Sequence, residues 1–366
     1  MWRYFLPTRV FSGSGVLKIN QTVFKENGTK ALVVTGRSSA RVSGALDDTI
    51  EILMNLDVPY VLFDGVEENP SFATVEKGGK IMGEDDCDFV VAIGGGSPLD
   101  AAKAISTLNK NKGITCDDLY RGDSLAAFPI IAIPTTSGTG SEVTPYSILT
   151  DSNGTKRGFG MSSTFPIVSF LDARYTLTMS HEVTLATALD ALSHSLEGEV
   201  VNNGDNPLVK MLSAESTGII HRVLPRLMNR ENDLTLREKI QYAAMLAGMV
   251  IAHTGTTAAH AAGYPLSSFK GIKHGIANAV TIIKVFERIA QADPERIARA
   301  IEPFESIGEL EEFLDSFEVQ KMVPALTEDE VQRWSEQSSK ASHNKKTPGN
   351  LDRDFYIDLY RGLGKH

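Results

Sequence analysis

Two side chains that can bind divalent cations lie one helical turn apart in this sequence. Asp190 and His194 are four residues apart in the segment Leu-Asp-Ala-Leu-Ser-His. On a helix this spacing puts a carboxylate and an imidazole on the same face. The pair is a candidate for two ligands of one metal ion, although the same spacing is also that of an ordinary helical ion pair.

A second group of candidate ligands follows further along the chain. His253, His260 and Tyr264 are spaced at i, i+7 and i+11, which predicts one face of a single helix, and Pro265 is expected to end that helix. His274 follows before a glycine, in what we interpret as a loop. A lone histidine is usually a surface or core residue, but two pairs in one half of the chain favour a metal site. We expect no role at the site for the remaining histidines, which are His181, His221, His343 and His366.

The chemistry of such a site follows from its ligand types. One aspartate with three neutral histidines leaves a divalent cation with a single net positive charge and an open coordination position. Oxygen and nitrogen ligands without a thiolate suit Fe(II), Zn(II) or a similar ion. Such an ion acidifies a bound hydroxyl and polarises a carbonyl, and the interconversion of an alcohol and a carbonyl compound needs both effects.

The clearest signal in the first half of the chain is an expected strand that runs into three glycines. The strand Asp88–Ile93 precedes Gly94–Gly96, after which Ser97 is expected as a helix N-cap and Pro98 as the first helical residue. Asp100 resembles the acidic partner of a capping box. Glycines let a phosphate approach the backbone, and the helix start supplies free N–H groups. The segment predicts a phosphate site, with a plain tight turn as the alternative, and it matches neither G-x-G-x-x-G nor the P-loop.

A second polar segment follows another expected strand. Pro134–Thr144 is rich in hydroxyls and glycines and comes directly after Pro129–Ile133. At the carboxyl end of a parallel sheet, where open α/β folds bind their ligands, these side chains would line a binding site. A polar loop without a ligand is the alternative.

The two halves of the chain differ in the secondary structure that their sequence patterns predict. Short runs rich in valine and isoleucine alternate with amphipathic stretches in the first half, which predicts strands joined by helices and a mostly parallel sheet covered on both faces. After about Asp172 long segments rich in alanine and leucine predict an all-helical half. We expect an α/β domain at residues 1–176, a helical domain at 177–366, a boundary in the region of residues 172–180 and the ligand site in the cleft between the domains. The expected strands are Lys30–Thr35, Pro59–Phe63, Asp88–Ile93 and Pro129–Ile133. The expected helices are Leu46–Leu56, Asp100–Leu108, Glu182–Val201, Leu208–Met228 and Leu234–Ala252.

Composition excludes several classes of function. The 366 residues carry 36 basic and 46 acidic side chains, a net charge of -10 that argues against general binding to nucleic acid or to anionic membranes. Cys87 and Cys116 are the two cysteines, too few for a disulfide framework or a Cys-rich zinc site. Neither the apolar core of a signal peptide nor an apolar stretch long enough to span a membrane is present in the sequence. We expect a soluble cytoplasmic protein.

Taken together, these segments resemble the iron-dependent (group III) alcohol dehydrogenase family nearly from end to end. The resemblance is carried by Gly94–Asp100, Pro134–Thr144, Asp190–His194, the step from His260 to His274, and Thr347–Gly349. It implies a dinucleotide-binding α/β domain, a helical domain, a divalent ion, a small alcohol or aldehyde substrate and a homodimer.

The resemblance also assigns roles to individual residues. The implied metal ligands are Asp190, His194, His260 and His274. The implied cofactor residues are Gly95, Gly96, Ser97 and Asp100 at the pyrophosphate, Thr135, Thr136, Thr139, Thr144, Tyr146, Lys156, Tyr175 and Met179 around the nicotinamide and ribose, and Asn69 at the cofactor's edge.

The sequence departs from the family pattern at two places. Many members carry a histidine that relays the alcohol proton where this chain has Tyr264, and a phenol relays a proton only if its pKa is shifted. We favour a role for Tyr264 in shaping the pocket. Members that prefer NAD have an aspartate after the first strand, where this chain has Gly36 followed by Arg37, Ser38 and Ser39. That segment predicts NADP(H), with NAD(H) as the alternative.

Two other classes of function compete with a dehydrogenase. Dehydroquinate synthases share the architecture but need many basic residues for an anionic substrate, whereas Ile251–Lys270 is mostly small and apolar. A non-catalytic sensor that keeps the cofactor fold is the other alternative, and the intact set of candidate metal ligands argues against it.

Overall fold

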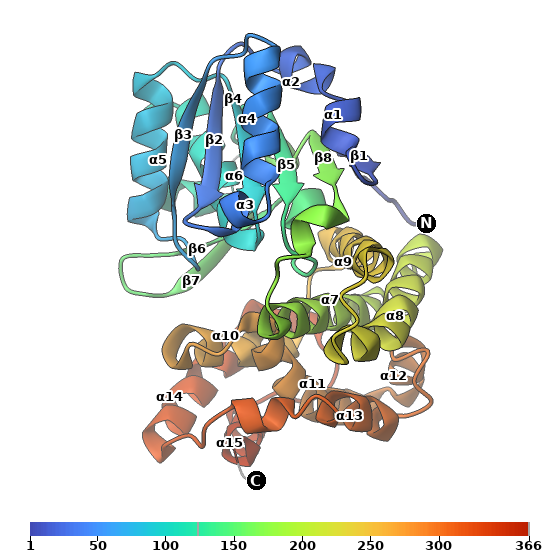
Figure 1. Ribbon diagram of the computed structural model, residues 1–366. Helices are drawn as coiled ribbons and strands as arrows, with labels where there is room; N and C mark the ends of the chain where they lie inside the picture. The colour runs from blue at the N-terminus through green and yellow to red at the C-terminus, as the bar shows by residue number, and fades with distance from the viewer. Residues whose placement is uncertain (123, 365–366) are drawn as a thin grey trace. The chain divides into compact units, whose positions relative to one another are not determined.

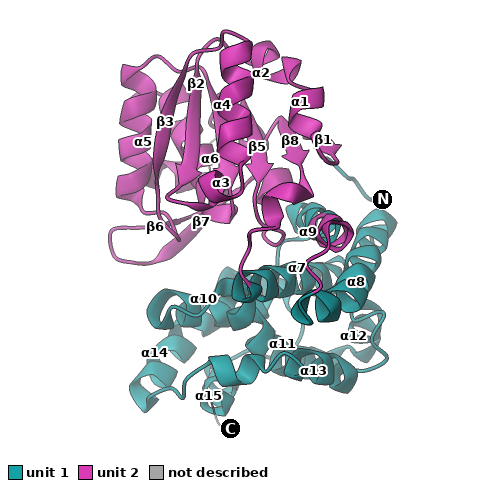
Figure 2. Ribbon diagram, viewed as in Figure 1, with its two compact units in different colours: residues 1–5, 181–230, 242–366 teal, residues 6–180, 231–241 magenta. Residues whose placement is uncertain are grey.

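The structure is a computed structural model that describes residues 1–122 and 124–364, and it divides into two compact units (Figures 1 and 2). The α/β unit contains Leu6–Ser180 and Glu231–Gln241. The helical unit contains Met1–Phe5, His181–Arg230 and the chain from Tyr242 onward. Both units are discontinuous in sequence, whereas the expected domains are continuous, and the expected boundary between residues 176 and 177 stays a prediction.

The α/β unit is built on six parallel strands in the order β1-β8-β5-β4-β2-β3. The predicted parallel sheet and its four expected strands are therefore confirmed, while β1 and β8 were not expected. The strands are β1 (Arg9–Ser12), β2 (Ala31–Gly36), β3 (Tyr60–Val66), β4 (Phe89–Gly94), β5 (Ile130–Pro134) and β8 (Val168–Leu171).

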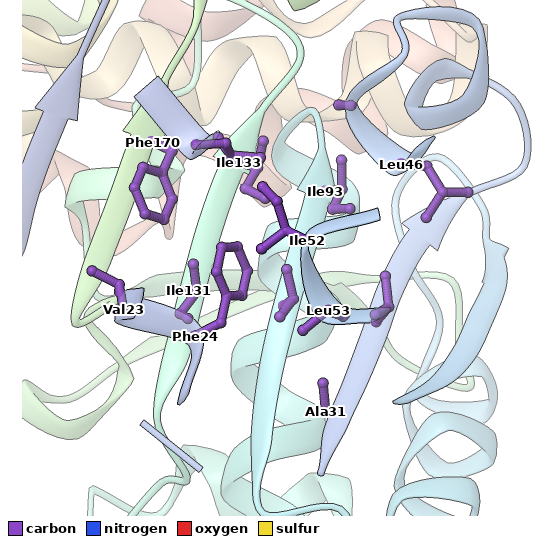
Figure 3. Packing of buried hydrophobic residues seen from close by; sticks show 14 of the residues in the cluster. Val23, Phe24, Ala31, Leu46, Ile52, Leu53, Ile93, Ile131, Ile133 and Phe170 are labelled. Carbon is purple, nitrogen blue, oxygen red and sulfur yellow. The ribbon is translucent and has the colours of Figure 1, made fainter. Parts of the chain in front are cut away.

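Side chains alternate between two hydrophobic cores, one on each face of the sheet. Val33, Val91 and Ile131 point to the face covered by α1, α2 and α4, which Figure 3 shows in close-up. Leu32 and Val90 point to the opposite face, where α5 and α6 pack. The helices of this unit are α1 (Val16–Ile19), α2 (Thr22–Glu26), α3 (Ser39–Val42), α4 (Ala45–Asn55), α5 (Phe72–Glu84) and α6 (Gly96–Lys110).

An antiparallel hairpin lies outside the main sheet and was not expected. It consists of β6 (Tyr146–Thr150) and β7 (Lys156–Gly160), with Tyr146 opposite Gly160. The segment between β5 and the hairpin contains the threonines of Pro134–Thr144. The hairpin therefore holds the C-terminal end of the predicted binding segment Pro134–Thr144.

The helical unit confirms the three long helices expected in the second half of the chain. Its helices are α7 (His181–Asn202), α8 (Pro207–Met228), α9 (Leu234–Thr254), α10 (Ala258–Lys270), α11 (His274–Ala292), α12 (Pro294–Ala300), α13 (Ile307–Asp315), α14 (Glu328–Ser339) and α15 (Arg353–Gly362). Residues 234–241 at the start of α9 group with the α/β unit. Among the residues that the structure describes, no helix combines the length and apolar character needed to cross a membrane.

Two expectations about the histidine-bearing segment are wrong. Gly255, at φ 70°, separates α9 from α10, so His253 and His260 lie on different helices. Pro265 does not end α10 but lies inside it. The carbonyl of Ala261, which Pro265 cannot engage because it has no N–H, accepts a hydrogen bond from Ser338 Oγ at 3.3 Å instead.

Candidate active site

The three-glycine turn forms where β4 meets α6. Gly94 has φ 151°, a conformation that disfavours side chains. A Cβ at Gly95 would lie 3.2 Å from Thr136 Cγ2, and one at Gly96 would lie 2.8 Å from Thr139 Cγ2. The glycines therefore let the start of α6 approach the threonine segment after β5, which brings four of the predicted cofactor residues together.

The expected capping box at this turn is wrong. Helix α6 begins at Gly96 with Gly95 as its N-cap, and no side chain caps it within the described part of the chain. Ser97 lies inside the first turn, where its Oγ accepts a hydrogen bond from the backbone N of Asn69 at 3.2 Å. This contact places Asn69, in the left-handed region at φ 56°, beside the helix start. Because no side chain caps them, the first N–H groups of α6 are available to an anionic ligand.

Asp100 does not cap α6 but holds the threonine segment and the start of the hairpin in place. Its carboxylate accepts hydrogen bonds from Ser141 Oγ at 2.7 Å and from the backbone N of Ile148 at 2.9 Å. Beside it the buried ammonium of Lys103 donates to the carbonyls of Ser141 and Tyr146, at 2.8 and 2.7 Å. Burial lowers the pKa of Lys103 to about 8. Lys103 was not predicted as a site residue, although its spacing of three residues from Asp100 is that of a helical ion pair.

The other predicted cofactor residues do not all lie beside the glycine turn. The hydroxyl of Thr135 is buried without a hydrogen-bond partner among the described residues, as expected of a group that faces a ligand, and the same holds for Ser137, which was not predicted. Tyr175 lies in the core on the α4 side of the sheet, and its hydroxyl donates to Asp48 at 2.7 Å. Within the described chain no hydrogen bond joins Tyr175 or the half-buried Met179 to the glycine turn. The remaining predicted residues lie on or beside the hairpin and are Thr144, Tyr146 and Lys156.

The segment after β2 carries the predicted cofactor selectivity. Gly36 is the last residue of β2, and Arg37, Ser38 and Ser39 are exposed. A Cβ at Gly36 would lie 3.6 Å from Pro98 Cγ, so this segment is next to the start of α6. The same Cβ would meet no atom closer than 3.5 Å, which leaves room for a side chain.

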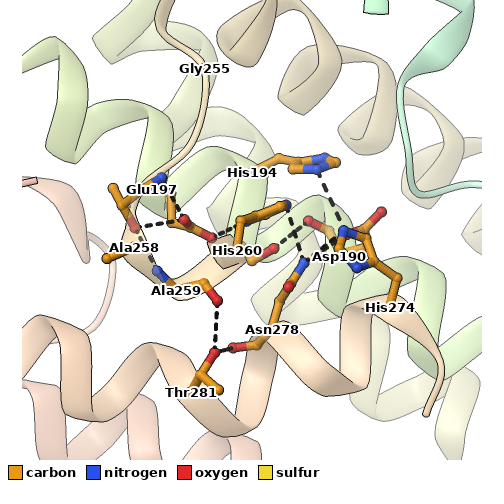
Figure 4. A network of polar contacts seen from close by, with 12 residues as sticks. Asp190, His194, Glu197, Gly255, Ala258, Ala259, His260, His274, Asn278 and Thr281 are labelled. Carbon is orange, nitrogen blue, oxygen red and sulfur yellow. Dashed lines mark hydrogen bonds and ion pairs between the residues drawn. The ribbon is translucent and has the colours of Figure 1, made fainter. Parts of the chain in front are cut away.

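Three helices of the helical unit bring the candidate metal ligands together (Figure 4). Asp190 and His194 lie on one face of α7, His260 is on α10, and His274 is the first residue of α11 rather than part of a loop. One ligand atom each from Asp190, His260 and His274 lies within 4.8 Å of the others. His194 Nε2 is 3.7 Å from Asp190 Oδ1, and its ring stacks on that of His260 at 5.0 Å.

Close backbone packing makes this arrangement possible. A Cβ at Gly275 would lie 1.8 Å from the carbonyl oxygen of Ala186, so the start of α11 abuts the backbone of α7 one turn before Asp190. A Cβ at Gly263 would likewise lie 2.4 Å from Asn278 Oδ1, where α10 packs on α11. The absence of two side chains thus sets the position of His274 and His260.

Glu197 orients His260 and was not found from the sequence. Its fully buried carboxylate accepts a hydrogen bond from His260 Nδ1 at 2.6 Å and two more from the backbone N and Oγ1 of Thr257, at 2.7 and 2.6 Å. Burial lowers the pKa of His260, but the charge and hydrogen bond of Glu197 outweigh burial and raise it. With Nδ1–H donating to Glu197, Nε2 is an acceptor that faces Asp190, the tautomer that a metal ligand requires.

Asn278, also missed in the sequence, shows that the candidate ligands point at one place. Its amide Nδ2 lies 3.2 Å from Asp190 Oδ1, 3.1 Å from His260 Nε2 and 3.3 Å from His274 Nε2. Three acceptor atoms that converge on one donor would converge equally on a cation. One carboxylate with imidazole nitrogens, buried at Asp190 and His260 and partly exposed at His274, therefore fits a divalent ion of the Fe(II) or Zn(II) type.

The remaining aromatic and histidine residues separate into those near this cluster and those away from it. Tyr264 stacks flat on His274 at 5.6 Å between ring centroids, and His343 contacts the edge of Tyr264 at 5.8 Å. His343, for which the sequence indicated no partner, thus lies beside Tyr264, whereas its lack of a role stays a prediction and His366 lies outside the described residues. His253, expected on the face of His260, stacks instead on Tyr4 at 3.9 Å, and its Nε2 accepts from the backbone N of Phe5.

Comparisons with known proteins show the family to which the chain belongs. Residues 7–173 match the family model described as iron-containing alcohol dehydrogenase, and residues 184–331 match that of the C-terminal part of the Fe-containing family. A 1,3-propanediol dehydrogenase of Citrobacter freundii is 32% identical over 307 residues, 81% of this chain and 78% of its own. An NADPH-dependent butanol dehydrogenase of Clostridium saccharobutylicum is 31% identical over 86% of this chain and 81% of its own. The crystal structure of an iron-containing alcohol dehydrogenase from Thermotoga maritima superposes with a TM-score of 0.92 and 43% identity over 99% of each chain.

Proposed function

Because this chain belongs to the iron-containing alcohol dehydrogenase family, we propose that it transfers a hydride between NADP(H) and a small alcohol or aldehyde at a cation held by Asp190, His194, His260 and His274. The observation that carries the proposal is the convergence of Asp190 Oδ1, His260 Nε2 and His274 Nε2 on one point, with Glu197 holding the far nitrogen of His260. Such a carboxylate–histidine pair is the usual support of a metal-binding imidazole.

We propose Fe(II) as the ion, on the family name, with Zn(II) as the alternative that the same ligand types accept. A divalent ion bound there acidifies an alcohol hydroxyl and polarises a carbonyl. The protein's part is to keep the site dry and the acceptor atoms aligned. Asp190, His194 and His260 are buried, and Asn278 donates to the carboxylate of Asp190.

The α/β unit supplies the groups proposed to bind the cofactor. The uncapped start of α6 at Gly96 and Ser97 would hold the pyrophosphate, and the threonine segment would line the rest of the molecule. NADP(H) is proposed over NAD(H) because Gly36 adds neither charge nor bulk where a carboxylate would repel a 2′-phosphate. The exposed guanidinium of Arg37 and the hydroxyls of Ser38 and Ser39 can donate hydrogen bonds to that phosphate.

Two further assignments are proposals about the protein as a whole. Cys87 and Cys116 are both free and buried, which suits a reducing cytoplasm. The family resemblance implies a homodimer, and light scattering during size-exclusion chromatography would test it.

A substrate and cofactor screen tests the proposed function. The metal-free protein is loaded with Fe(II) without oxygen, and the absorbance of the reduced nicotinamide is followed with short alcohols and aldehydes and each of the two cofactors. We expect turnover with NADP(H) that exceeds turnover with NAD(H). Loaded enzyme that reduces no aldehyde and oxidises no alcohol with either cofactor would refute the proposal.

A further inference from the structure

A fully buried lysine ties α6 to the threonine segment Pro134–Thr144. The side chain of Lys103 is 0% exposed. Its Nζ donates to the carbonyl of Ser141 at 2.8 Å, to Ser141 Oγ at 2.7 Å and to the carbonyl of Tyr146 at 2.7 Å. An ammonium group has three hydrogens. All of them are bound by the protein, so Lys103 has no donor left for a ligand.

Asp100, one helical turn before Lys103, holds the same part of the chain. Its Oδ1 accepts a hydrogen bond from Ser141 Oγ at 2.7 Å, and its Oδ2 accepts one from the backbone N of Ile148 at 2.9 Å. Its backbone carbonyl accepts from Ser147 Oγ at 2.8 Å. Lys103 Nζ lies 3.9 Å from Asp100 Oδ1. One turn of α6 thus holds both Ser141 and the first residues of β6.

These contacts lead from Ser141 back to the start of α6. The backbone N of Ser141 donates to Thr139 Oγ1 at 3.2 Å. A Cβ at Gly96 would lie 2.8 Å from Thr139 Cγ2, so Thr139 packs against the first residue of α6. The free N–H groups proposed to bind the pyrophosphate begin at that residue. Lys103 therefore fixes, through Ser141, a threonine that lies beside the proposed pyrophosphate site.

The buried charges cost desolvation energy that an apolar side chain would avoid. Burial lowers the pKa of Lys103 to about 8, against the attraction of Asp100 and Glu142, and burial raises the pKa of Asp100. A methionine would fill similar space without that cost. It would lack direction, however, because it cannot hold the carbonyl and hydroxyl of Ser141 in one place.

We propose that Lys103 is a positioning residue for cofactor binding, which holds the threonine segment in the arrangement that the cofactor requires. The inference rests on the proposed function, because it takes this segment to line the nicotinamide half of NADP(H). Without these hydrogen bonds the segment takes up other arrangements, and binding must first return it to one. The loss of affinity should fall on the nicotinamide half and spare the adenosine half, which Gly36–Ser39 is proposed to hold.

The test compares the dissociation constant of NADPH, measured from its fluorescence, with that of 2′,5′-ADP, measured by calorimetry. The second ligand is the adenosine end of NADPH and lacks the nicotinamide riboside and its phosphate. We expect Lys103→Met to weaken NADPH roughly tenfold or more, since several hydrogen bonds are lost, and 2′,5′-ADP less than about twofold. Ser141→Ala keeps the buried charges paired and should weaken NADPH about 2- to 13-fold, the effect of one hydrogen bond.

Two variants of the same helix serve as controls. Ser106 is also a buried serine of α6, but its Oγ donates to the carbonyl of Phe128 at 2.8 Å, outside the threonine segment. Ser106→Ala should therefore leave both dissociation constants unchanged. Lys110→Met removes an exposed lysine from the last turn of α6 and controls for the loss of a positive charge. In turnover, the effect of Ser141→Ala should appear in KM for NADPH and not in kcat.

Equal weakening of NADPH and 2′,5′-ADP in Lys103→Met would overturn the proposal, since a general loss of structure affects both ligands alike. If thermal melting shows that Lys103→Met does not fold, Ser141→Ala decides, and an unchanged affinity for NADPH in that variant would overturn the proposal. Selective weakening supports the role of Lys103 even if no substrate is found and the proposed function fails. Turnover with an unchanged KM for NADPH in both variants overturns the positioning role and leaves the proposed function standing. Native enzyme that binds no NADPH would refute this role and the proposed cofactor together.

Discussion

At the scale of single residues, the structure explains how one imidazole is held ready to bind a cation. Glu197 fixes the Nδ1–H of His260, and Asn278 contacts the acceptor nitrogen on the other side of the ring. We expect Glu197→Gln to weaken metal affinity about 10- to 100-fold, because the amide keeps one hydrogen bond but loses the charge. Competition with a chelator measures the effect. Glu199→Gln is the control, since Glu199 is also buried on α7 but bonds Asn202, and equal losses in both variants would contradict the role of Glu197.

Cofactor choice is also decided by single residues. Gly36→Asp should reverse the preference from NADP(H) to NAD(H), since the carboxylate repels the 2′-phosphate and accepts bonds from the ribose. The added Cβ meets no atom closer than 3.5 Å, so folding should be preserved. Arg37→Ala should weaken NADP(H) by roughly 10- to 150-fold, the loss of a charge-assisted contact, with little effect on NAD(H). The ratio of kcat/KM for the two cofactors measures both variants, and a native ratio in favour of NAD(H) would disprove this interpretation.

The sequence could reveal the candidate metal ligands, but it could not reveal the residues that support them. Asp190 and His194 are found from spacing because both lie on one helix. Glu197 lies 63 residues from His260, and Asn278 lies 88 residues from Asp190, so only the packing of α7, α10 and α11 brings them together. The sequence indicated no partner for His343 for the same reason, because its neighbours belong to α10.

At the scale of elements, glycines set the distances between helices. Gly275→Ala would place a Cβ 1.8 Å from the carbonyl of Ala186, and because that atom is backbone, α11 itself must shift. We expect His274 to move away from Asp190 and metal affinity to fall at least tenfold, while the α/β unit still binds cofactor. Metal titration and fluorescence of bound NADPH separate the two effects. Gly271→Ala, at φ 68° with open space around it, controls for a general loss of stability, and unchanged metal binding in Gly275→Ala would show that this contact does not position His274.

A buried carboxyl within the threonine segment makes the stability of the α/β unit depend on pH. Burial raises the pKa of Glu142 to about 7 from 4.5, so between these values the folded protein holds more protons than the unfolded chain. The free energy of unfolding must then fall as pH rises through this window, by at most about 3 kcal/mol. Glu142→Gln should flatten that slope in urea unfolding measured from pH 4.5 to 7.5, whereas the exposed Glu68→Gln should not. An unaltered slope in Glu142→Gln would contradict the assignment.

Elements were predicted where their pattern was strong and missed where tertiary contacts define them. The buried strands rich in valine and isoleucine, such as β2 and β4, were expected to within a residue or so at each end. Strand β1 is half exposed at the sheet edge, and β8 is only four residues long, so neither has a clear pattern of its own. The periodicity from His253 to Tyr264 suggested one helix because it continues across Gly255, whose left-handed backbone ends α9.

At the scale of the whole molecule, the two halves of the proposed chemistry belong to different compact units. The glycine turn and the threonine segment lie in the α/β unit, and the four candidate metal ligands lie in the helical unit. The change near Asp172 from alternating strand and helix patterns to helical patterns alone predicted an α/β half followed by a helical half. Met1–Phe5 belongs to the helical unit and Glu231–Gln241 to the α/β unit. These assignments were not predictable from the sequence, because they rest on contacts such as that of Phe5 with His253.

Metal titration shows whether one cation at these four residues supports alcohol oxidation. Metal-free enzyme is titrated with Fe(II) without oxygen while bound metal and turnover of 1,3-propanediol with NADP are measured together. We expect activity to rise in proportion to bound metal and to stop rising at one equivalent per chain, and we expect His260→Ala neither to bind the ion nor to turn over substrate. Full activity of the metal-free protein, or of His260→Ala without metal, would contradict it.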